Sequence, residues 1–177
     1  GAHPTSGPRP DPGPIEARLA RAGLPPLARM AWLEIDLDAL RGNLAVLRSI
    51  VGPGTRVEPV VKADAYGHGA VPVSLALEAA GADGLSVATL DEAFELREAG
   101  VTLPLLVIYP IPPDAVAAAA AAGIAVSLGP GRDGERVLRA AAGLSSPLEV
   151  HLEVETGLGR GGVLPGAVAA AIAAVRA

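Results

Sequence analysis

A lysine stands at the end of an apolar run in the stretch VVKADAYGHGA, residues 60–70. Lys62 follows two valines, and Tyr66 and two glycines come after it. Apolar surroundings disfavour a charged amine, and a neutral lysine amine can attack a carbonyl and form a Schiff base. The tyrosine supplies a hydroxyl, and the glycines let the backbone approach a ligand closely. Together these residue types predict a site for an aldehyde that carries a phosphate.

A structural alternative for Lys62 is an ion pair with Asp64, since lysines in ion pairs are commoner than nucleophilic lysines. The neighbouring tyrosine and glycines favour the chemical interpretation. If residues 57–64 form a parallel strand, Val60 and Lys62 share one face of it. Lys62 then lies at the carboxyl end of the strand, where α/β enzymes place their chemistry.

A second candidate region alternates apolar and polar residues in LEVHLEVET, residues 148–156. Glu149, His151, Glu153 and Glu155 would share one face of a strand. The pattern indicates either an edge strand with one wet side or a barrel strand with a polar interior. The loop GLGRGG follows at residues 157–162, and its spacing is not that of a nucleotide-binding loop.

These candidate residues lie within a regular alternation of predicted strands and helices. Strands are predicted at residues 32–37, 57–64, 84–90, 104–110, 124–128 and 148–156. Helices are predicted at residues 15–29, 36–52, 70–81, 91–100, 112–123, 131–143 and 164–177. Glycines stand where a helix gives way to the next strand, as in GADGL, GVTLP and GIAV. This order is typical of parallel βα units.

The number of units bounds the fold. Five βα units follow the predicted strand at residues 32–37. A closed (β/α)8 barrel needs eight units and about 250 residues, so we expect an incomplete barrel that belongs to a longer protein. An open doubly wound sheet is the alternative, and periodicity alone does not separate the two.

Composition excludes several classes of protein. With 50% hydrophobic and 19% charged residues among 177, the chain is expected to form a globular core. A net charge of -5 argues against a basic face for nucleic acid or for an anionic membrane surface. The lack of cysteine excludes disulfides, thiolate metal sites and a cysteine nucleophile, and it fits a cytoplasmic location. We expect no membrane span and no metal site.

The first 29 residues are rich in proline and glycine and are predicted to form a flexible arm or an upstream extension. Within them, residues 15–29 are expected to contribute one short helix that ends at Gly23. Met30 is the single methionine, and it is either a natural start site or a core residue. We therefore divide the chain into an arm, residues 1–29, and a barrel portion, residues 30–177.

The stretch VVKADAYGHG resembles the pyridoxal 5'-phosphate (PLP) lysine motif of the alanine racemases. The resemblance extends to AWLEIDLDALRGNL before it and to VATLDEAFELREAG and VETGLGRGGV after it. It implies a fold-type III PLP enzyme, in which an α/β barrel of the TIM type precedes a separate β-rich domain. It further implies a cytoplasmic homodimer that interconverts L-alanine and D-alanine and supplies D-alanine for peptidoglycan.

The resemblance also implies roles for particular residues. Lys62 holds PLP as a Schiff base and, once freed, acts as the base on one face of the α-carbon of the substrate. Tyr66 matches the tyrosine that binds the cofactor phosphate. Val60 and Ile108 match apolar residues that line the cofactor. Arg160 matches the arginine near the phenolic oxygen of the cofactor and the carboxylate of the substrate.

Racemisation needs acid/base groups on both faces, and the second one in this family is a tyrosine of the other subunit. The resemblance places that tyrosine beyond Ala177, so we expect residues 1–177 alone to be inactive. Glu153 stands where the family usually carries a lysine, often carbamylated, and we hypothesise that its carboxylate orients Arg160 instead. A serine or broader amino-acid racemase and a non-catalytic PLP-binding barrel protein are the alternatives, and the lysine motif argues against the second.

Overall fold

The computed structural model describes residues 13–28 and 31–176, in two compact units, Gly1–Ile35 and Asp36–Ala177. In the first unit, helix α1 (Ile15–Arg21) is followed by Gly23 at φ 68°, which confirms the predicted short helix. Trp32 Nε1 donates to Glu34 Oε1 at 2.9 Å, and Arg18 pairs with the same carboxylate. The strand predicted at residues 32–37 is wrong, because residues 31–36 form no ladder with another strand. Met30 lies outside the described residues.

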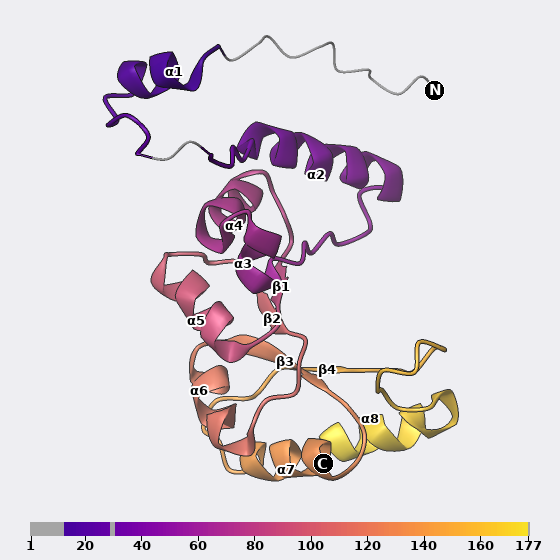
Figure 1. Cartoon of the computed structure of the whole chain (residues 1–177). Coiled ribbons are helices and arrows are strands. Elements are labelled where there is room, and N and C mark those ends of the chain that lie inside the picture. Colours follow the sequence, from indigo (N-terminus) through magenta and orange to yellow (C-terminus); the bar gives the residue numbers. More distant parts are fainter. Residues whose placement is uncertain (1–12, 29–30, 177) are drawn as a thin grey trace. The chain divides into compact units, whose positions relative to one another are not determined.

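The second unit is built on a parallel sheet. Within the described residues it has four strands, β1 (Leu85–Val87), β2 (Leu105–Val107), β3 (Ile124–Leu128) and β4 (Val150–Leu152), in the order β1-β2-β3-β4. Each strand pairs with the next one along the chain (Figure 1). A doubly wound sheet reverses its strand order at a switch point, and no reversal occurs here. The order therefore favours the barrel over the doubly wound sheet.

Helices connect the strands and confirm the predicted alternation. The helices of this unit are α2 (Leu37–Val51), α3 (Lys62–Gly67), α4 (Ala70–Ala79), α5 (Leu90–Glu98), η1 (Pro113–Ala115), α6 (Val116–Ala121), α7 (Arg132–Ala141), η2 (Pro165–Ala167) and α8 (Val168–Arg176). Helix α2 begins where predicted, because Asp36 accepts a hydrogen bond from the backbone N–H of Ala39 at 2.9 Å. Gly81, Gly100 and Gly123 follow α4, α5 and α6 with positive φ, as the end of a helix favours.

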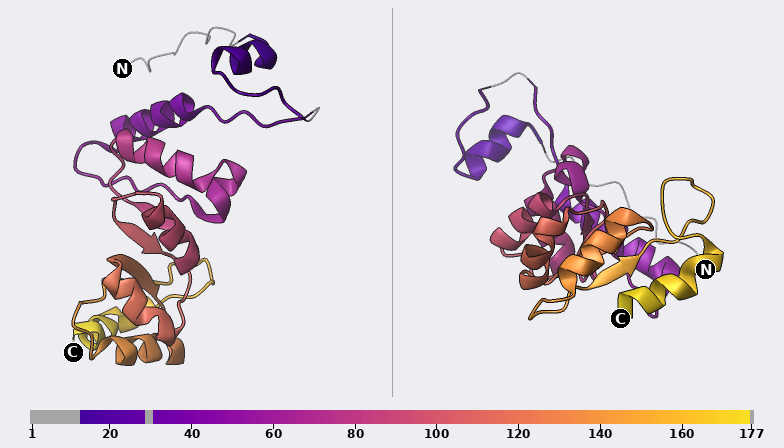
Figure 2. Two further views of the ribbon diagram at one scale, coloured as in Figure 1. Left: turned by 90° about the vertical axis from the view of Figure 1, so that its left-hand side faces the viewer. Right: turned by 90° about the horizontal axis from the view of Figure 1, so that it is seen from below.

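The two faces of the sheet differ in character. One face is fully buried and forms the core with Leu96 and Val116 of α5 and α6. Its strand residues are Leu85, Val87, Leu105, Val107, Ile124 and Val126. Figure 2 shows α5 and α6 alongside the strands. The opposite face carries Ser86, Leu106 and Ala125 in one register row and Ser127 with His151 in another, and in a barrel it is the face that lines the interior.

The strand predicted at residues 57–64 is shortened to a single parallel bridge between Val60 and Ser86. The backbone N–H of Val61 donates to Ser86 O at 2.8 Å, and that of Ser86 donates to Pro59 O at 2.9 Å. Proline has no N–H for a ladder, and the helical segment α3 begins directly at Lys62. The prediction was therefore right about the pairing and wrong about the length. The strand predicted at residues 148–156 is likewise reduced to β4 and a separate bridge between Val154 and Val163.

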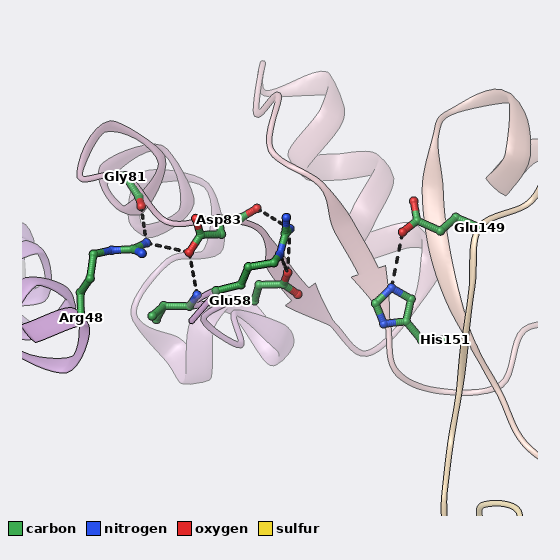
Figure 3. Close-up of polar contacts among 8 residues, drawn as sticks. Arg48, Glu58, Gly81, Asp83, Glu149 and His151 are labelled. Atoms are coloured by element: carbon green, nitrogen blue, oxygen red, sulfur yellow. Dashed lines mark hydrogen bonds and ion pairs between the residues drawn. The ribbon is translucent and has the colours of Figure 1, made fainter. Parts of the chain in front are cut away.

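A polar network ties the helices to the amino end of the sheet (Figure 3). Arg48 of α2 donates to Gly81 O at 2.6 Å and to Asp83 Oδ2 at 2.7 Å. Asp83 also accepts from the backbone N–H of Val57 at 2.6 Å. This N–H and the guanidinium of Arg48 hold the pKa of Asp83 below its usual value. Residues at this end of a βα barrel serve stability, while the chemistry lies at the opposite end.

Candidate active site

Lys62 lies where the bridged segment ends and an unusual turn begins. Residues 63–66 all have left-handed backbone angles, with φ between 51° and 58°. None of these residues is glycine, and each such residue costs about 1–2 kcal/mol, so the turn costs about 4 to 8 kcal/mol. Strain of this kind persists only where surrounding contacts over-determine the backbone, and it clusters at functional sites.

Val60 and Val61 differ in exposure as predicted, but the predicted pairs Val60 with Lys62 and Val61 with Ala63 are not kept, because the chain leaves the extended conformation at Lys62. Val61 is 2% exposed and faces the core, whereas Val60 is 42% exposed on the other face. Lys62 is half-buried, and its Nζ lies 5.3 Å from the centre of the Tyr109 ring, at the carboxyl end of β2. Ring faces attract ammonium groups at this distance. The amine therefore points toward the carboxyl ends of the strands.

No ion pair joins Lys62 to Asp64 or to any other carboxylate in residues 13–28 and 31–176. Asp64 Oδ1 instead accepts from the backbone N–H of Ala70 at 2.6 Å, at the first turn of α4. The alternative interpretation of Lys62 as the partner of Asp64 is therefore not supported. Lys62 is also the single lysine of the chain, so it carries the only side-chain amine.

One cavity of about 360 Å³ brings several predicted residues together at the carboxyl ends of β2, β3 and β4. Ile108, Tyr109, Ser127, Glu153 and Arg160 all contribute to its walls. It thus combines an apolar wall, a guanidinium and a carboxylate, and Tyr109 connects it with the amine of Lys62.

The structure places the other two predicted cofactor residues elsewhere. Val60 and Tyr66 line a separate, largely apolar cavity of about 260 Å³ beside α2 and α4. The Tyr66 side chain is 61% exposed. The left-handed turn carries Tyr66 away from the cavity that holds Arg160. The structure therefore brings Ile108 and Arg160 together and Val60 and Tyr66 together, with Lys62 adjacent to the first pair through Tyr109.

The loop that presents Arg160 is organised by a single carboxylate. Glu155 accepts from the backbone N–H groups of Gly157 at 2.5 Å and Gly159 at 3.0 Å. The N–H groups of Gly159 and Gly157 hold the pKa of Glu155 below its usual value. A side chain at Gly162 would lie 2.6 Å from the backbone nitrogen of Glu155, so only glycine fits where the loop returns. The sequence GLGRGG is therefore a tight loop closed on the preceding strand.

Two residues near Lys62 were missed by the sequence reasoning. Glu92 lies in the first turn of α5, where it forms a capping box with Thr89. It also accepts from the backbone N–H of Ala63 at 2.7 Å, across 29 positions of sequence. Tyr109 could have been found by its position alone, since it ends a predicted parallel strand.

A lysine, an arginine and an apolar wall at the carboxyl ends of sequentially ordered parallel strands define a βα-barrel chain with a site suited to carbonyl chemistry. Residues 35–177 match the family described as alanine racemase, N-terminal domain, and the chain belongs to this family. The predicted resemblance and the predicted fold, an α/β chain that forms part of a TIM-type barrel, are both confirmed.

Individual relatives support the same family. Alanine racemase of Desulfovibrio desulfuricans is 43% identical over 142 residues, which make up 80% of this chain and 38% of that protein. The structure of Clostridium difficile 630 alanine racemase in complex with cycloserine has a TM-score of 0.76 at 32% identity, and covers 84% of this chain and 42% of that one. Histidine racemase of Leuconostoc mesenteroides subsp. sake has a TM-score of 0.72 at 30% identity, with 79% and 38% covered. The chain therefore spans between 38% and 42% of the length of these relatives.

The described residues also bear on metal binding and on membrane insertion. In this part of the chain, no group of three or more His, Cys, Asp or Glu side chains is arranged to hold a metal ion. Each helix in residues 13–28 and 31–176 is too short or too polar to cross a bilayer.

Proposed function

We propose that the protein containing this chain is a PLP-dependent racemase that interconverts L-alanine and D-alanine. The observation that carries the proposal is Lys62, the single side-chain amine, which has no carboxylate partner among the described residues and lies beside the Arg160 cavity. Membership of the alanine racemase family supports the substrate. Supply of D-alanine for peptidoglycan, a cytoplasmic location and a homodimer are parts of the same proposal.

The residues present suit the chemistry of the cofactor. The aldehyde group of PLP needs an amine with which to form a Schiff base, and Lys62 provides that amine. The anionic oxygens of a pyridine cofactor and of an amino acid need a cation, and Arg160 provides a planar guanidinium. Ile108 supplies an apolar wall beside Arg160, and the proposed phosphate ligand is Tyr66. Tyr66 is largely exposed and lines a second cavity, so its binding of the phosphate stays a prediction.

When bound, PLP supplies the electron sink that lowers the cost of removing the α-proton of an amino acid. Lys62 would take or return that proton on one face, since its amine points to the carboxyl ends of the strands. Arg160 would bind the carboxylate of the substrate and fix the orientation of its α-carbon. Racemisation requires a second acid/base group on the opposite face, and we propose that the other subunit supplies it.

Cofactor attachment can be tested directly because the chain has one lysine. The protein is incubated with PLP, reduced with borohydride and digested, and the modified peptide is identified by mass spectrometry. We expect one pyridoxyl group, on Lys62. Lys62→Ala and Lys62→Arg should both lose it, and the arginine variant controls for the loss of positive charge. Modification of the N-terminal amine alone would overturn the proposed attachment.

A second candidate is a racemase of broader amino-acid range. It is favoured by the likeness to a solved structure named as a histidine racemase, which shares the fold at 30% identity. Exchange of the α-proton in deuterated water, measured for alanine, serine and histidine on the whole protein, separates the candidates. Exchange with alanine only supports the first. PLP attachment without exchange of any amino acid would favour the non-catalytic barrel protein.

A further inference from the structure

The carboxylate of Glu92 joins two consecutive βα units at their carboxyl ends. Its Oε1 accepts from the backbone N–H of Ala63 at 2.7 Å. Its Oε2 accepts from the backbone N–H groups of Ala88 at 2.7 Å and Thr89 at 3.3 Å. Both oxygens are therefore engaged, each with a different loop.

The N–H of Ala63 belongs to the peptide unit that directly follows Lys62. Its direction fixes the ψ angle of Lys62 and hence the direction in which the side chain leaves the backbone. Ala63 is also the first residue of the left-handed turn, at φ 52° and ψ 52°. A hydrogen bond to the backbone N–H of Ala63 therefore affects both the orientation of the Lys62 amine and the backbone conformation at the start of the left-handed turn.

The other contacts that hold the turn come from its own neighbourhood. Asp64 accepts from Ala70 N–H at 2.6 Å, the N–H of Gly69 donates to Asp64 O at 2.9 Å, and His68 Nδ1 lies 2.7 Å from Ala65 O. Glu92 differs because it comes from the next βα unit, on α5. A turn with an unfavourable backbone keeps its geometry only if outside contacts over-determine it.

We propose that Glu92 is a positioning residue for Lys62. It acts through the backbone N–H of Ala63, and it holds the amine in the direction that the reaction requires. This inference rests on the proposed function, because it assigns Lys62 the role of cofactor lysine. It differs from the capping role, since the capping box uses the contact with the start of α5 and does not need Ala63.

The chain offers a matched control for the structural part of this role. Glu78 of α4 is another half-buried carboxylate that joins consecutive units, and it accepts from the N–H of Thr102 at 3.0 Å and from its hydroxyl at 2.5 Å. Thr102 precedes β2, so this contact lies at the amino end of the sheet. Glu78→Ala removes a comparable set of hydrogen bonds without touching the Lys62 turn.

Two readouts on the full chain test the proposal. The first is the rate at which borohydride-trapped pyridoxyl-Lys62 forms. The second is hydrogen exchange of the Ala63 amide, measured by NMR without cofactor. We expect Glu92→Ala to slow trapping by tenfold to hundredfold, on the order of the loss that a misplaced reacting group causes. It should also speed exchange of the Ala63 amide, whereas Glu78→Ala leaves both readouts at the wild-type level.

Glu92→Gln keeps the test decisive if the alanine variant fails to fold. Glutamine has one acceptor oxygen, and we expect that oxygen to stay with the two N–H groups of Ala88 and Thr89, so that its NH₂ group faces the N–H of Ala63. We expect faster Ala63 exchange and slower trapping in this variant too. Wild-type values for both readouts in Glu92→Gln would overturn the inference, as would equal losses in Glu78→Ala. If the wild-type chain forms no adduct at all, the proposed function fails, while Ala63 exchange still decides whether Glu92 holds the turn.

Discussion

Ala63→Gly should stabilise the protein, although glycine normally destabilises a folded chain. Ala63 has φ 52° and an exposed side chain, so the substitution removes no core packing. A left-handed residue with a Cβ costs about 1–2 kcal/mol, and glycine avoids this cost. An opposing effect is that glycine has more conformational freedom in the unfolded chain, which lowers the free energy of unfolding by about 0.5–1 kcal/mol. The difference lies between about 0 and 1.5 kcal/mol, so we expect the free energy of unfolding to rise by about 0.75 kcal/mol.

Urea unfolding followed by circular dichroism measures this change, with Ala45→Gly as the matched control. Ala45 is an exposed alanine in the interior of α2, so its replacement should lower the free energy of unfolding by about 1 kcal/mol. The two variants have the same change of composition and opposite expected signs. If both variants lose stability equally, the left-handed turn is not strained as described, and the argument for outside support of that turn fails with it.

Three further outcomes follow from named contacts. Ser74→Ala should raise the free energy of unfolding by about 1 kcal/mol, because the Ser74 hydroxyl is buried in α4 and has no hydrogen-bond partner among the described residues; an unchanged or lower midpoint in urea would contradict this. Leu96→Ala should lower the same free energy by about 2–5 kcal/mol, since Leu96 is fully buried in the core under α5. The order of the Arg160 loop should depend on acid pH, because the pKa of Glu155 is held below 4.5 by the N–H groups of Gly159 and Gly157. A lowered pKa means that the contribution of Glu155 is present above pH 4.5 and is lost as the pH falls through the folded-state value. The amide NMR signals of Gly157 and Gly159 should report this transition, and Glu155→Gln should abolish it.

Local signals in the sequence predicted much of the fold. The start of α2 follows from Asp36, and glycines after α4, α5 and α6 mark where those helices end, because caps and positive φ act within one turn. The opposite exposure of Val60 and Val61 was also predictable, since side chains alternate along an extended chain. Strand order was not, because neighbours in a sheet are set by contacts far apart in sequence.

In the candidate site, too, some features could be predicted from local sequence and others depend on contacts between distant residues. The position of Lys62 at a carboxyl end and its family role could be proposed from one stretch of sequence. The left-handed backbone of residues 63–66 could not, because none of them is a glycine that would signal it. The hydrogen bond from Ala63 to Glu92 spans 29 positions, and the separation of Tyr66 from Arg160 depends on the direction of that same turn.

The sequential order of the strands has a consequence for how the chain folds while it is being synthesised on the ribosome. Each of the strands β2, β3 and β4 finds its partner in the strand synthesised just before it. Each of these three strands can therefore dock onto a neighbour that has already emerged from the ribosome. The growing end of the nascent sheet advances with translation, so the lysine turn can form before the arginine loop leaves the exit tunnel.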